Sequence, residues 1–282
     1  MKVGLINLDH TLSCGQVFRW SKGPEGWRGF IRNRPVLVRQ ADGQVEVDGD
    51  VSEAEVLSYF RSGDDLDEIL RDISKDAYIS DLVRRYRGLR LVRQDPWECA
   101  ASYILATYAS ITRIEGMIDA VCRTFGAEVS SGRYSFPTPR EVIENEEAAA
   151  RCRLGFRCRR FVEFAGRVND GDLDFERLKA VSYRDCVAEL RRFEGIGEKV
   201  ADCIALFSLD HLESFPVDVR IRRAMSRQYG ASGSYRKIGE AAREYFGRYA
   251  GYAQEYIYAS EARKSPLGRR LIPSAGRRTE AP

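Results

Sequence analysis

The sequence predicts an α+β fold in which an N-terminal antiparallel β-sheet domain packs on a larger, all-helical domain. This prediction rests first on a change of apolar period along the chain. Apolar and polar residues alternate in short runs up to Val47, and apolar residues recur at helical spacing after Ser52. A length of 282 residues with 44% apolar residues is sufficient for two packed units. We expect a sheet-containing domain with flanking helices at 1–94, a helical domain at 95–262 and a basic tail at 263–282.

The N-terminal segment is expected to form an antiparallel meander. Its alternating runs are separated by residues typical of tight turns, among them Lys22-Gly-Pro-Glu-Gly26 and Ala41-Asp-Gly43. Such turns let each strand reverse and pair with the next one. We expect the strands in four runs: Gln16–Trp20, Trp27–Ile31, Val36–Gln40 and Val45–Val47.

The helical part of the chain begins with a capping signal. Ser52 is followed three residues later by Glu55, the spacing of a capping box. The apolar spacing beyond this point predicts a series of helices, and strands largely disappear. The predicted helices lie near 52–61, 74–86, 96–108, 111–125, 139–145, 156–168, 183–192, 197–209, 219–228, 235–247 and 249–261.

Composition excludes several kinds of chemistry. The seven cysteines are scattered and form no CxxC pair, which argues against a disulfide framework and against a zinc ribbon. Only His10 and His211 are present, so a Ser-His-Asp triad and a multi-histidine metal site are not expected. Catalysis would depend on Lys, Asp, Glu, Tyr or Cys.

Total charge says little, because 45 basic side chains nearly balance 42 acidic ones. The local basic clusters are either phosphate contacts or solvated helix faces. No apolar run approaches the ~20 residues of a membrane span, so we expect no membrane partner and a location in the cytosol or nucleoid. The basic clusters are residues 151–160, Arg220-Ile-Arg222-Arg223, and the tail with Arg269, Arg270, Arg277 and Arg278.

The segment from Leu190 to Cys203 contains the most informative motif. Gly195-Ile-Gly197 lies between two predicted helices, and its glycines permit a tight reversal with backbone N–H groups pointing outward. A helix N-terminus of this kind can hold a nucleic-acid phosphate without reading its sequence. The pattern matches a helix-hairpin-helix motif. The alternative is that the glycines only end one helix.

Two residues near this motif are candidates for catalysis. Lys199 falls in the first turn of the second helix, where the helix dipole disfavours a cation and favours the neutral amine that a nucleophile needs. Asp218 follows Phe215-Pro-Val at the expected N-cap of the next helix. Taken alone, Lys199 could be a solvated lysine and Asp218 could be only a helix cap.

Together these residues resemble the 8-oxoguanine DNA glycosylase/AP lyase branch of the helix-hairpin-helix DNA glycosylase superfamily. The core of the resemblance is Gly195-Ile-Gly197-Glu-Lys199-Val-Ala-Asp202-Cys203 followed by Pro216-Val-Asp218-Val. It covers residues 8 to 262 and leaves out the basic tail. Five further segments agree with it: Cys14-Gly15-Gln16-Val-Phe18-Arg-Trp20, Arg93-Gln-Asp95-Pro96, Ile111-Thr-Arg113-Ile, Leu154-Gly155-Phe156-Arg157, and Ala250-Gly-Tyr-Ala-Gln254-Glu-Tyr-Ile-Tyr258.

The resemblance implies a bifunctional repair enzyme that flips a damaged guanine out of duplex DNA. By this analogy, neutral Lys199 attacks C1′ as 8-oxoguanine leaves, and the resulting Schiff base permits β-elimination. Asp218 would stabilise the positive charge that develops on the sugar and would help to orient or deprotonate the lysine. The implied partner is double-stranded DNA that contains oxidised guanine, with cytosine opposite the lesion.

The resemblance also assigns a pocket for the flipped base. Gly15 falls at the position whose carbonyl accepts the N7–H that only the oxidised base carries. Cys203 and Tyr258 fall at the positions that sandwich the base, and Gln254 at the one that bonds its Watson–Crick edge. Without the resemblance, Cys203 would be a small buried helix residue and Tyr258 an ordinary core aromatic.

Further residues are assigned to the DNA around the lesion. Phe156 falls where the family wedges the duplex, and Arg157 and Arg113 fall where the orphaned cytosine is read. An aromatic wedge flanked by guanidinium groups suits an unstacked step and a bare base edge. Arg157 could equally be a solvated charge in a basic run.

The chain departs from the family pattern in two places. Relatives often carry an asparagine-rich stretch that fills the gap left by the flipped base, and this chain has Thr107-Tyr108-Ala109-Ser110 instead. Tyr108 is expected to fill the gap by stacking, which leaves the opposite-base preference open. Arg220 replaces a histidine common in the family and keeps a phosphate-binding charge with a different pH response.

No cofactor is expected. Iron–sulfur relatives place four cysteines after the catalytic aspartate, and no cysteine follows Cys203 here. The resemblance is compatible with a structural cation between the hairpin carbonyls and a DNA phosphate, although no side-chain cluster encodes a metal site. We expect a monomer. Two alternatives stay open: a monofunctional alkylbase glycosylase, which would use Asp218 with water and no lysine, and a DNA-binding module that only grips phosphates.

Overall fold

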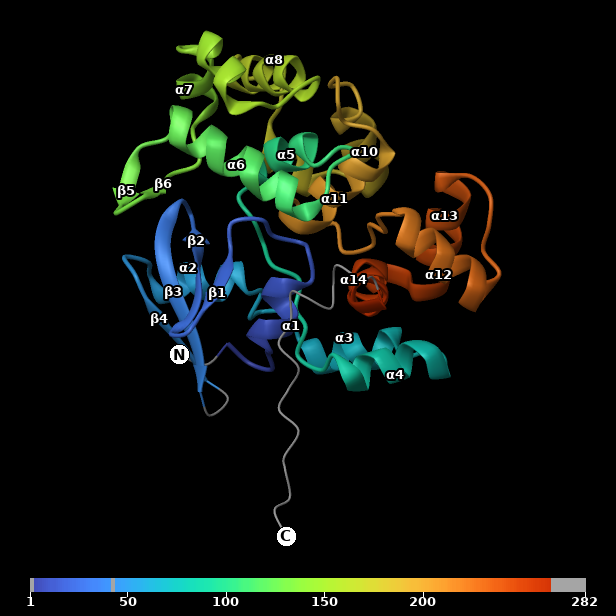
Figure 1. The fold of residues 1–282 in the computed structure, drawn as a ribbon. Helices are drawn as coiled ribbons and strands as arrows, with labels where there is room; N and C mark the ends of the chain where they lie inside the picture. The colour runs from blue at the N-terminus through green and yellow to red at the C-terminus, as the bar shows by residue number, and fades with distance from the viewer. Residues whose placement is uncertain (1–2, 42–43, 265–282) are drawn as a thin grey trace.

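A computed structural model describes residues 3–41 and 44–264 and places a four-stranded sheet beside a larger group of helices (Figure 1). The strands pair antiparallel in the order β1-β2-β3-β4, which confirms the predicted meander. Their bounds are β1 (Ser21–Gly23), β2 (Gly26–Ile31), β3 (Arg34–Ala41) and β4 (Gln44–Asp48). Part of the predicted Ala41-Asp-Gly43 turn, residues 42–43, lies outside the described residues.

One predicted strand is wrong, because Gln16–Trp20 forms no ladder. Gln16 is buried, and its side-chain amide donates to the carbonyls of Thr11 at 2.8 Å and Arg90 at 2.9 Å. This amide therefore joins separate segments through their backbones, and the chain around it has an irregular course. Trp20 ends the segment and packs directly over Gly29 of β2, where a Cβ atom would lie 2.1 Å from the indole ring.

Every predicted helix is present, with its ends shifted by a few residues. Three α-helices, two 3-10 turns and a small hairpin were not predicted, since each is short: α1, α3, α9, η1, η2 and the pair β5 (Glu128–Ser130) and β6 (Arg133–Tyr134). The helices are α1 (Leu8–Ser13), α2 (Glu53–Tyr59), α3 (Leu66–Ile73), α4 (Ala77–Arg85), α5 (Pro96–Leu105), α6 (Ile111–Phe125), α7 (Pro139–Ile143), η1 (Glu146–Cys152), α8 (Arg157–Asn169), α9 (Phe175–Ala180), α10 (Tyr183–Leu190), α11 (Glu198–Ser208), α12 (Val219–Tyr229), α13 (Tyr235–Phe246), η2 (Gly247–Tyr249) and α14 (Ala250–Lys264).

Helix α14 joins the two ends of the chain. It packs against α3 and α4 from the N-terminal segment and against α12 and α13 from the C-terminal segment (Figure 1). One apolar core accordingly contains side chains from all of these helices and from α5 and α11. A separate core lies under the sheet, and a third one joins α6 to α8. Residues from both ends of the sequence can therefore line a common site.

The middle of α8 is anchored through an aromatic cluster. Phe164 is buried, stacks on Trp97 of α5 with ring centroids 5.7 Å apart, and meets Phe193 edge-on at 5.5 Å. Phe193 lies just before Gly195-Ile-Gly197, so this cluster ties α8 and α5 to the glycine turn.

Phe164→Ala is expected to lower the free energy of unfolding by about 3–5 kcal/mol, because it opens a cavity in the core. Urea denaturation measures this change. Phe156→Ala is the matched control: its ring lies at the start of the same helix but is 53% exposed, so the expected change is within about 0.5 kcal/mol. Equal effects of the two substitutions would contradict this account of the cluster.

Candidate active site

A cavity of about 610 Å3 opens between α1, the α5–α6 connection, α11, α12 and α14. It brings together residues that are more than 200 positions apart in the sequence. The candidate catalytic pair Lys199 and Asp218 lines it, and so do all four residues assigned to the lesion pocket and Arg220. The walls also include Phe18, Tyr103, Phe207, Pro216 and Glu255.

The glycine turn has the geometry of a hairpin between α10 and α11. Gly195 has φ of +93°, a conformation that favours glycine, and a Cβ atom there would lie 3.1 Å from Cδ of Arg160. Gly197 is the N-cap of α11 and has no side chain to satisfy the first N–H groups of that helix. These donors are available to an anion at the helix N-terminus.

Lys199 is the second residue of α11 and points into the cavity wall beside aromatic and sulfur groups. Its Nζ atom lies 4.9 Å from the centroid of the Tyr103 ring. Cys203 lies one turn further along α11 and is buried. Burial raises the pKa of the Cys203 thiol to about 11 and outweighs the opposite influence of Lys199, so the sulfur stays protonated near neutral pH. Cys203 therefore offers a neutral, polarisable wall rather than a thiolate nucleophile.

Asp218 is the N-cap of α12, as predicted. Its Oδ1 atom accepts the backbone N–H of Ile221 at 2.7 Å, which fixes the carboxylate at the cavity wall. The N-terminal dipole of α12 favours the negative charge at this place. Capping and participation in a reaction are compatible, because a carboxylate has two oxygens and four acceptor positions.

A buried carboxylate holds Lys199 and Asp218 in their relative positions. Asp202 of α11 accepts the Ser214 hydroxyl at 2.9 Å and also the hydroxyls of Tyr183 and Tyr235. Tyr235 in turn accepts the backbone N–H of Val217 at 3.3 Å, next to Asp218. Burial raises the pKa of Asp202, and these hydrogen bonds act in the opposite direction. The sequence motif contains Asp202, but only the structure reveals that it joins α11 to the segment before α12.

Gly15, Tyr258 and Arg220 form another wall. Gly15 has φ of +93°, and a Cβ atom on it would lie 3.2 Å from the Tyr258 ring, so glycine is required here. Arg220 donates from Nη1 to the Tyr258 hydroxyl at 2.9 Å. The arginine that replaces the family histidine thus orients the aromatic side chain of the pocket.

Two consecutive polar side chains of α14 are buried at the cavity. Gln254 and Glu255 are both nearly inaccessible, and the Oε1 atom of each has no hydrogen-bond partner. Burial raises the pKa of Glu255 to about 7, with Asp218 acting in the same direction and Cys14 and Lys199 in the opposite one. Sequence reasoning missed Glu255, although a lone carboxylate between the apolar residues of α14 was a signal for it.

Two aromatic side chains that the resemblance assigns to the DNA, Tyr108 and Phe156, are exposed. Tyr108 is 92% exposed, has φ of +52°, and precedes Ser110, which lines the cavity. The exposed Phe156 ring lies at the start of α8, with the guanidinium carbons of Arg157 and Arg160 at 4.3 and 5.5 Å from its centroid.

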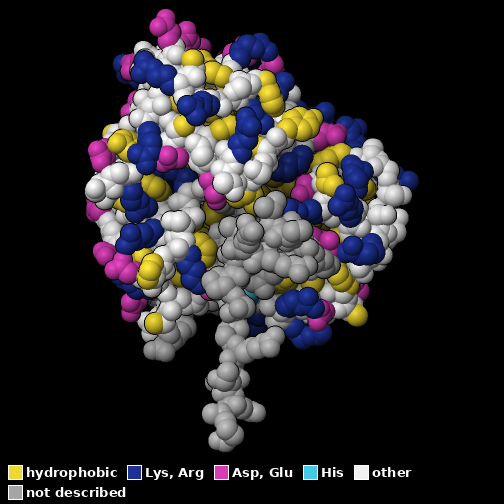
Figure 2. Space-filling model, in the orientation of Figure 1, with side chains coloured by type: hydrophobic (Ala, Val, Ile, Leu, Met, Phe, Trp, Pro, Cys, Tyr) yellow, Lys and Arg dark blue, Asp and Glu magenta, His cyan; other side chains and the backbone are white. Residues whose placement is uncertain are grey.

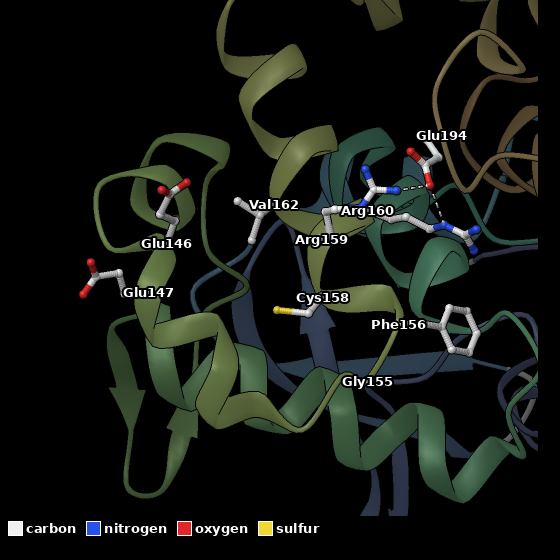
Figure 3. A pocket seen from close by; sticks show the side chains of 9 residues that line it. All are labelled: Glu146, Glu147, Gly155, Phe156, Cys158, Arg159, Arg160, Val162 and Glu194. Carbon is white, nitrogen blue, oxygen red and sulfur yellow. Dashed lines mark hydrogen bonds and ion pairs between the residues drawn. The ribbon is translucent and has the colours of Figure 1, made fainter.

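The arginines of residues 151–160 have distinct environments. Arg157 is only 3% exposed, and its Nε donates to the Thr107 carbonyl at 2.8 Å, so it holds the loop that carries Tyr108. Arg113 is exposed on α6 near enough to lower the pKa of Arg157, although burial is the larger cause. Figure 3 shows Arg159 and Arg160 directed at Glu194, the residue before the hairpin, at 2.6 and 3.3 Å.

Charge on the face of the molecule drawn in Figure 2 is mixed rather than gathered. On the face drawn in Figure 2, Lys and Arg side chains are spread among Asp and Glu side chains. Arg269, Arg270, Arg277 and Arg278 of the tail lie outside the described residues. Within residues 3–41 and 44–264, no three His, Cys, Asp or Glu side chains are grouped so that they could hold a metal ion. No helix in these two ranges is long and apolar enough to cross a membrane.

The sequence of this chain is similar to a known protein family and to proteins of known activity. Residues 1–100 match the family described as the 8-oxoguanine DNA glycosylase N-terminal domain. The chain is 30% identical to the N-glycosylase/DNA lyase OGG1 of Arabidopsis thaliana, over 91% of this chain and 77% of that protein. The chain belongs to the 8-oxoguanine DNA glycosylase family.

Solved structures agree with this assignment to the 8-oxoguanine DNA glycosylases. The 8-oxoguanine glycosylase/lyase of Clostridium acetobutylicum in its apo form is 32% identical, with a TM-score of 0.85 over 90% of this chain and 92% of that chain. The same enzyme in complex with double-stranded DNA that contains cytosine opposite 8-oxoguanine has a TM-score of 0.85 over 92% of both chains. The predicted fold, the DNA glycosylase and AP lyase activities and DNA as the partner are thereby confirmed.

Glu255→Gln is expected to change how stability depends on pH. A folded-state pKa of about 7, against a reference value of 4.5, means that the stability contributed by the protonated carboxyl is present below pH 4.5 and is lost as pH rises through 7. Between pH 4 and 8 the wild type should lose roughly 3 kcal/mol relative to the variant. Denaturant titrations at several pH values measure the difference.

Glu163→Gln, which removes an exposed carboxyl of α8, is the control and should show no comparable pH-dependent change. A difference between wild type and Glu255→Gln that stays constant from pH 4 to 8 would show that Glu255 does not titrate in this range.

Proposed function

We propose that this glycosylase excises 8-oxoguanine opposite cytosine with Lys199 as the nucleophile. The observation that carries the proposal is the single cavity that brings Lys199 and Asp218 together with the residues assigned to the lesion pocket. Among the described residues that line it, Lys199 has the only primary amine. An amine is required for a bifunctional reaction, since only it can form an iminium with the sugar.

The proposed reaction has two stages. The neutral Lys199 amine attacks C1′, the bond from C1′ to the base breaks, and the base leaves with the electron pair and takes up a proton. Loss of a proton from nitrogen and opening of the sugar ring give the Schiff base, and removal of a C2′ proton then expels the 3′ phosphate by β-elimination. Every reacting group here is a side chain or part of the DNA, so the chemistry requires no cofactor.

Asp218 would assist by charge. Its capping bond to Ile221 holds the carboxylate still, so it can stabilise the positive charge on the sugar without reorganising. Asp218 lines the same cavity as Lys199, which also suits it to orient the amine.

Recognition of the lesion would rest on the cavity walls. The Gly15 carbonyl would accept N7–H of 8-oxoguanine, a group that undamaged guanine lacks. Cys203 and Tyr258 would enclose the flipped base, and Gln254 would bond its Watson–Crick edge through an amide whose oxygen is otherwise without a partner. Arg220 supports this arrangement by holding the Tyr258 hydroxyl.

The rim would hold the rest of the duplex. Exposed Tyr108 would stack in the gap left by the base, and Phe156 would wedge the opposite strand. Arg113 would read the orphaned cytosine, and Arg157 would join it only after releasing the Thr107 carbonyl. Gly195 and Gly197 would bind a phosphate through backbone N–H groups, with a cation between the hairpin carbonyls and the phosphate as a further contact. We infer that the enzyme acts as a monomer, since one chain contributes all of these groups.

Lys199→Gln is expected to abolish excision and strand nicking, because glutamine cannot form an iminium. The measurement is borohydride trapping on a duplex with one 8-oxoguanine opposite cytosine. Lys237→Gln is the matched control: Lys237 also lies in the first turn of a helix, α13, but is exposed and away from the cavity. A trapped adduct with Lys199→Gln would disprove the assignment of Lys199 as the nucleophile. The absence of an adduct with active wild type would favour a monofunctional glycosylase.

Tyr108→Ala is expected to weaken binding of the lesion duplex by roughly 1–3 kcal/mol, the usual loss when a base loses an aromatic stacking partner. Binding is measured in the Lys199→Gln background, where the DNA stays intact. Since the side chain is 92% exposed, its removal should leave folding unchanged. A single-stranded lesion oligonucleotide has no gap to fill, so an equal loss of affinity for it would assign Tyr108 to general DNA contact instead.

A further inference from the structure

Glu255 is a buried carboxyl at the cavity to which the proposed reaction assigns no role. Its side chain is 2% exposed, and it lies on α14 between Gln254 and Tyr258. One of its oxygens, Oε1, is buried without a hydrogen-bond partner. A buried carboxylate with an unpartnered oxygen is costly, so its place in the same cavity as the Lys199 amine requires an explanation.

Burial outweighs the groups that stabilise a negative charge on Glu255, of which a hydrogen bond with the Cys14 thiol is the strongest. The Cys14 thiol, which is close to it, donates to the Thr11 carbonyl at 3.1 Å, and the same sulfur accepts the Gln16 amide at 3.3 Å. Lys199 is the cation that acts on Glu255, and Asp218 adds a second negative charge. Titratable groups lining the cavity are His10 and Cys14 of α1 and its C-cap, Tyr86 at the end of α4, Tyr103 of α5, Lys199 and Cys203 of α11, Asp218 and Arg220 at the start of α12, and Tyr258 of α14.

The proposed function leaves one proton without a destination. Lys199 attacks only as the neutral amine, so its ammonium form has to give up a proton before the attack. The proton therefore has to be held somewhere when the active site is closed by DNA. In the proposed function Asp218 stays ionised to stabilise the positive charge on the sugar, so it is not the group that keeps this proton.

Resting on that proposed function, we propose that Glu255 accepts the proton that Lys199 gives up and holds it while the amine attacks. The Lys199 ammonium loses one proton, Glu255 changes from carboxylate to carboxylic acid, and the total charge of the cavity is unchanged. Burial of Glu255 favours its carboxylic acid form, because a buried charge is then replaced by a neutral group. Glu255 thus acts through Lys199 and sets the pH range in which the nucleophile is available.

The electrostatic surroundings agree with this role. Burial is the main cause that brings the pKa of Glu255 to about 7, so both of its forms are accessible near neutral pH. A general acid or base is most effective when its pKa lies near the working pH. Cys203, by contrast, keeps its proton in this range and cannot take another one.

The test is the pH dependence of Glu255→Gln, which keeps the size of the side chain and removes its ability to take a proton. Single-turnover excision of 8-oxoguanine and borohydride trapping on a preformed abasic duplex are both measured from pH 6 to 10. We expect a loss of about 10²-fold or more in both reactions at pH 7, because positioned proton transfer contributes this much. The loss should shrink as pH rises, because hydroxide can then take the proton in place of Glu255.

A matched control and a second variant accompany this test. Glu261→Gln makes the same change on the same helix, at a carboxyl that pairs with Arg227 at 2.7 Å outside the cavity, and should keep the wild-type pH profile. Glu255→Asp retains a carboxyl and should keep a profile of the wild-type shape with a lower rate, even if Glu255→Gln folds poorly. Affinity for lesion DNA, measured in the Lys199→Gln background, should change less than threefold on adding Glu255→Gln.

Three outcomes would overturn the proposal. A wild-type rate and pH profile in Glu255→Gln would show that the carboxyl takes no part. Loss of excision with normal trapping on the abasic duplex would show that Glu255 contacts the base instead of serving the lysine. A Glu255→Asp profile identical to that of Glu255→Gln would show that proton uptake is irrelevant. Failure of the proposed function is distinguishable, since the wild type itself would then form no trapped adduct.

Discussion

The buried carboxylate of Asp202 is the constraint on which the site depends. It lies in the same helix as Lys199 and binds Ser214, Tyr183 and Tyr235, while Tyr235 holds the backbone next to Asp218. A charge in this position is tolerated only because several hydroxyl groups surround it. The same hydrogen bonds therefore stabilise the fold and fix the position of Lys199 relative to Asp218.

The second requirement is the packing of α14 between the two ends of the chain. Helix α14 contributes Gln254, Glu255 and Tyr258 to the cavity, and the segment around Gly15 closes it from the N-terminal side. Gly15 has no Cβ, so Tyr258 can approach its backbone closely. A base-sized cavity thus forms where elements distant in sequence meet, as is usual for ligand sites between packed elements.

Much of the fold could be predicted because its signals are local. Turn residues and alternation defined β2 to β4, and capping residues with 3.6-residue periodicity located eleven helices. Helix α3 was missed although its apolar residues recur at helical spacing, because it is short and carries four charged residues. Gln16–Trp20 was wrong as a strand, since buried hydrogen bonds of Gln16 to distant carbonyls override the local pattern.

The sequence by itself determined the hairpin, the first-turn lysine and the capping aspartate, because each depends on neighbours within a few residues. Only the tertiary structure decided that Arg157 is buried against Thr107, that Arg220 binds Tyr258, and that Glu255 lies in the same cavity as Lys199 and Asp218 without a partner for Oε1. The physical reason is that burial and long-range electrostatics depend on which helices meet, and residue spacing along one helix does not encode the charge of the next.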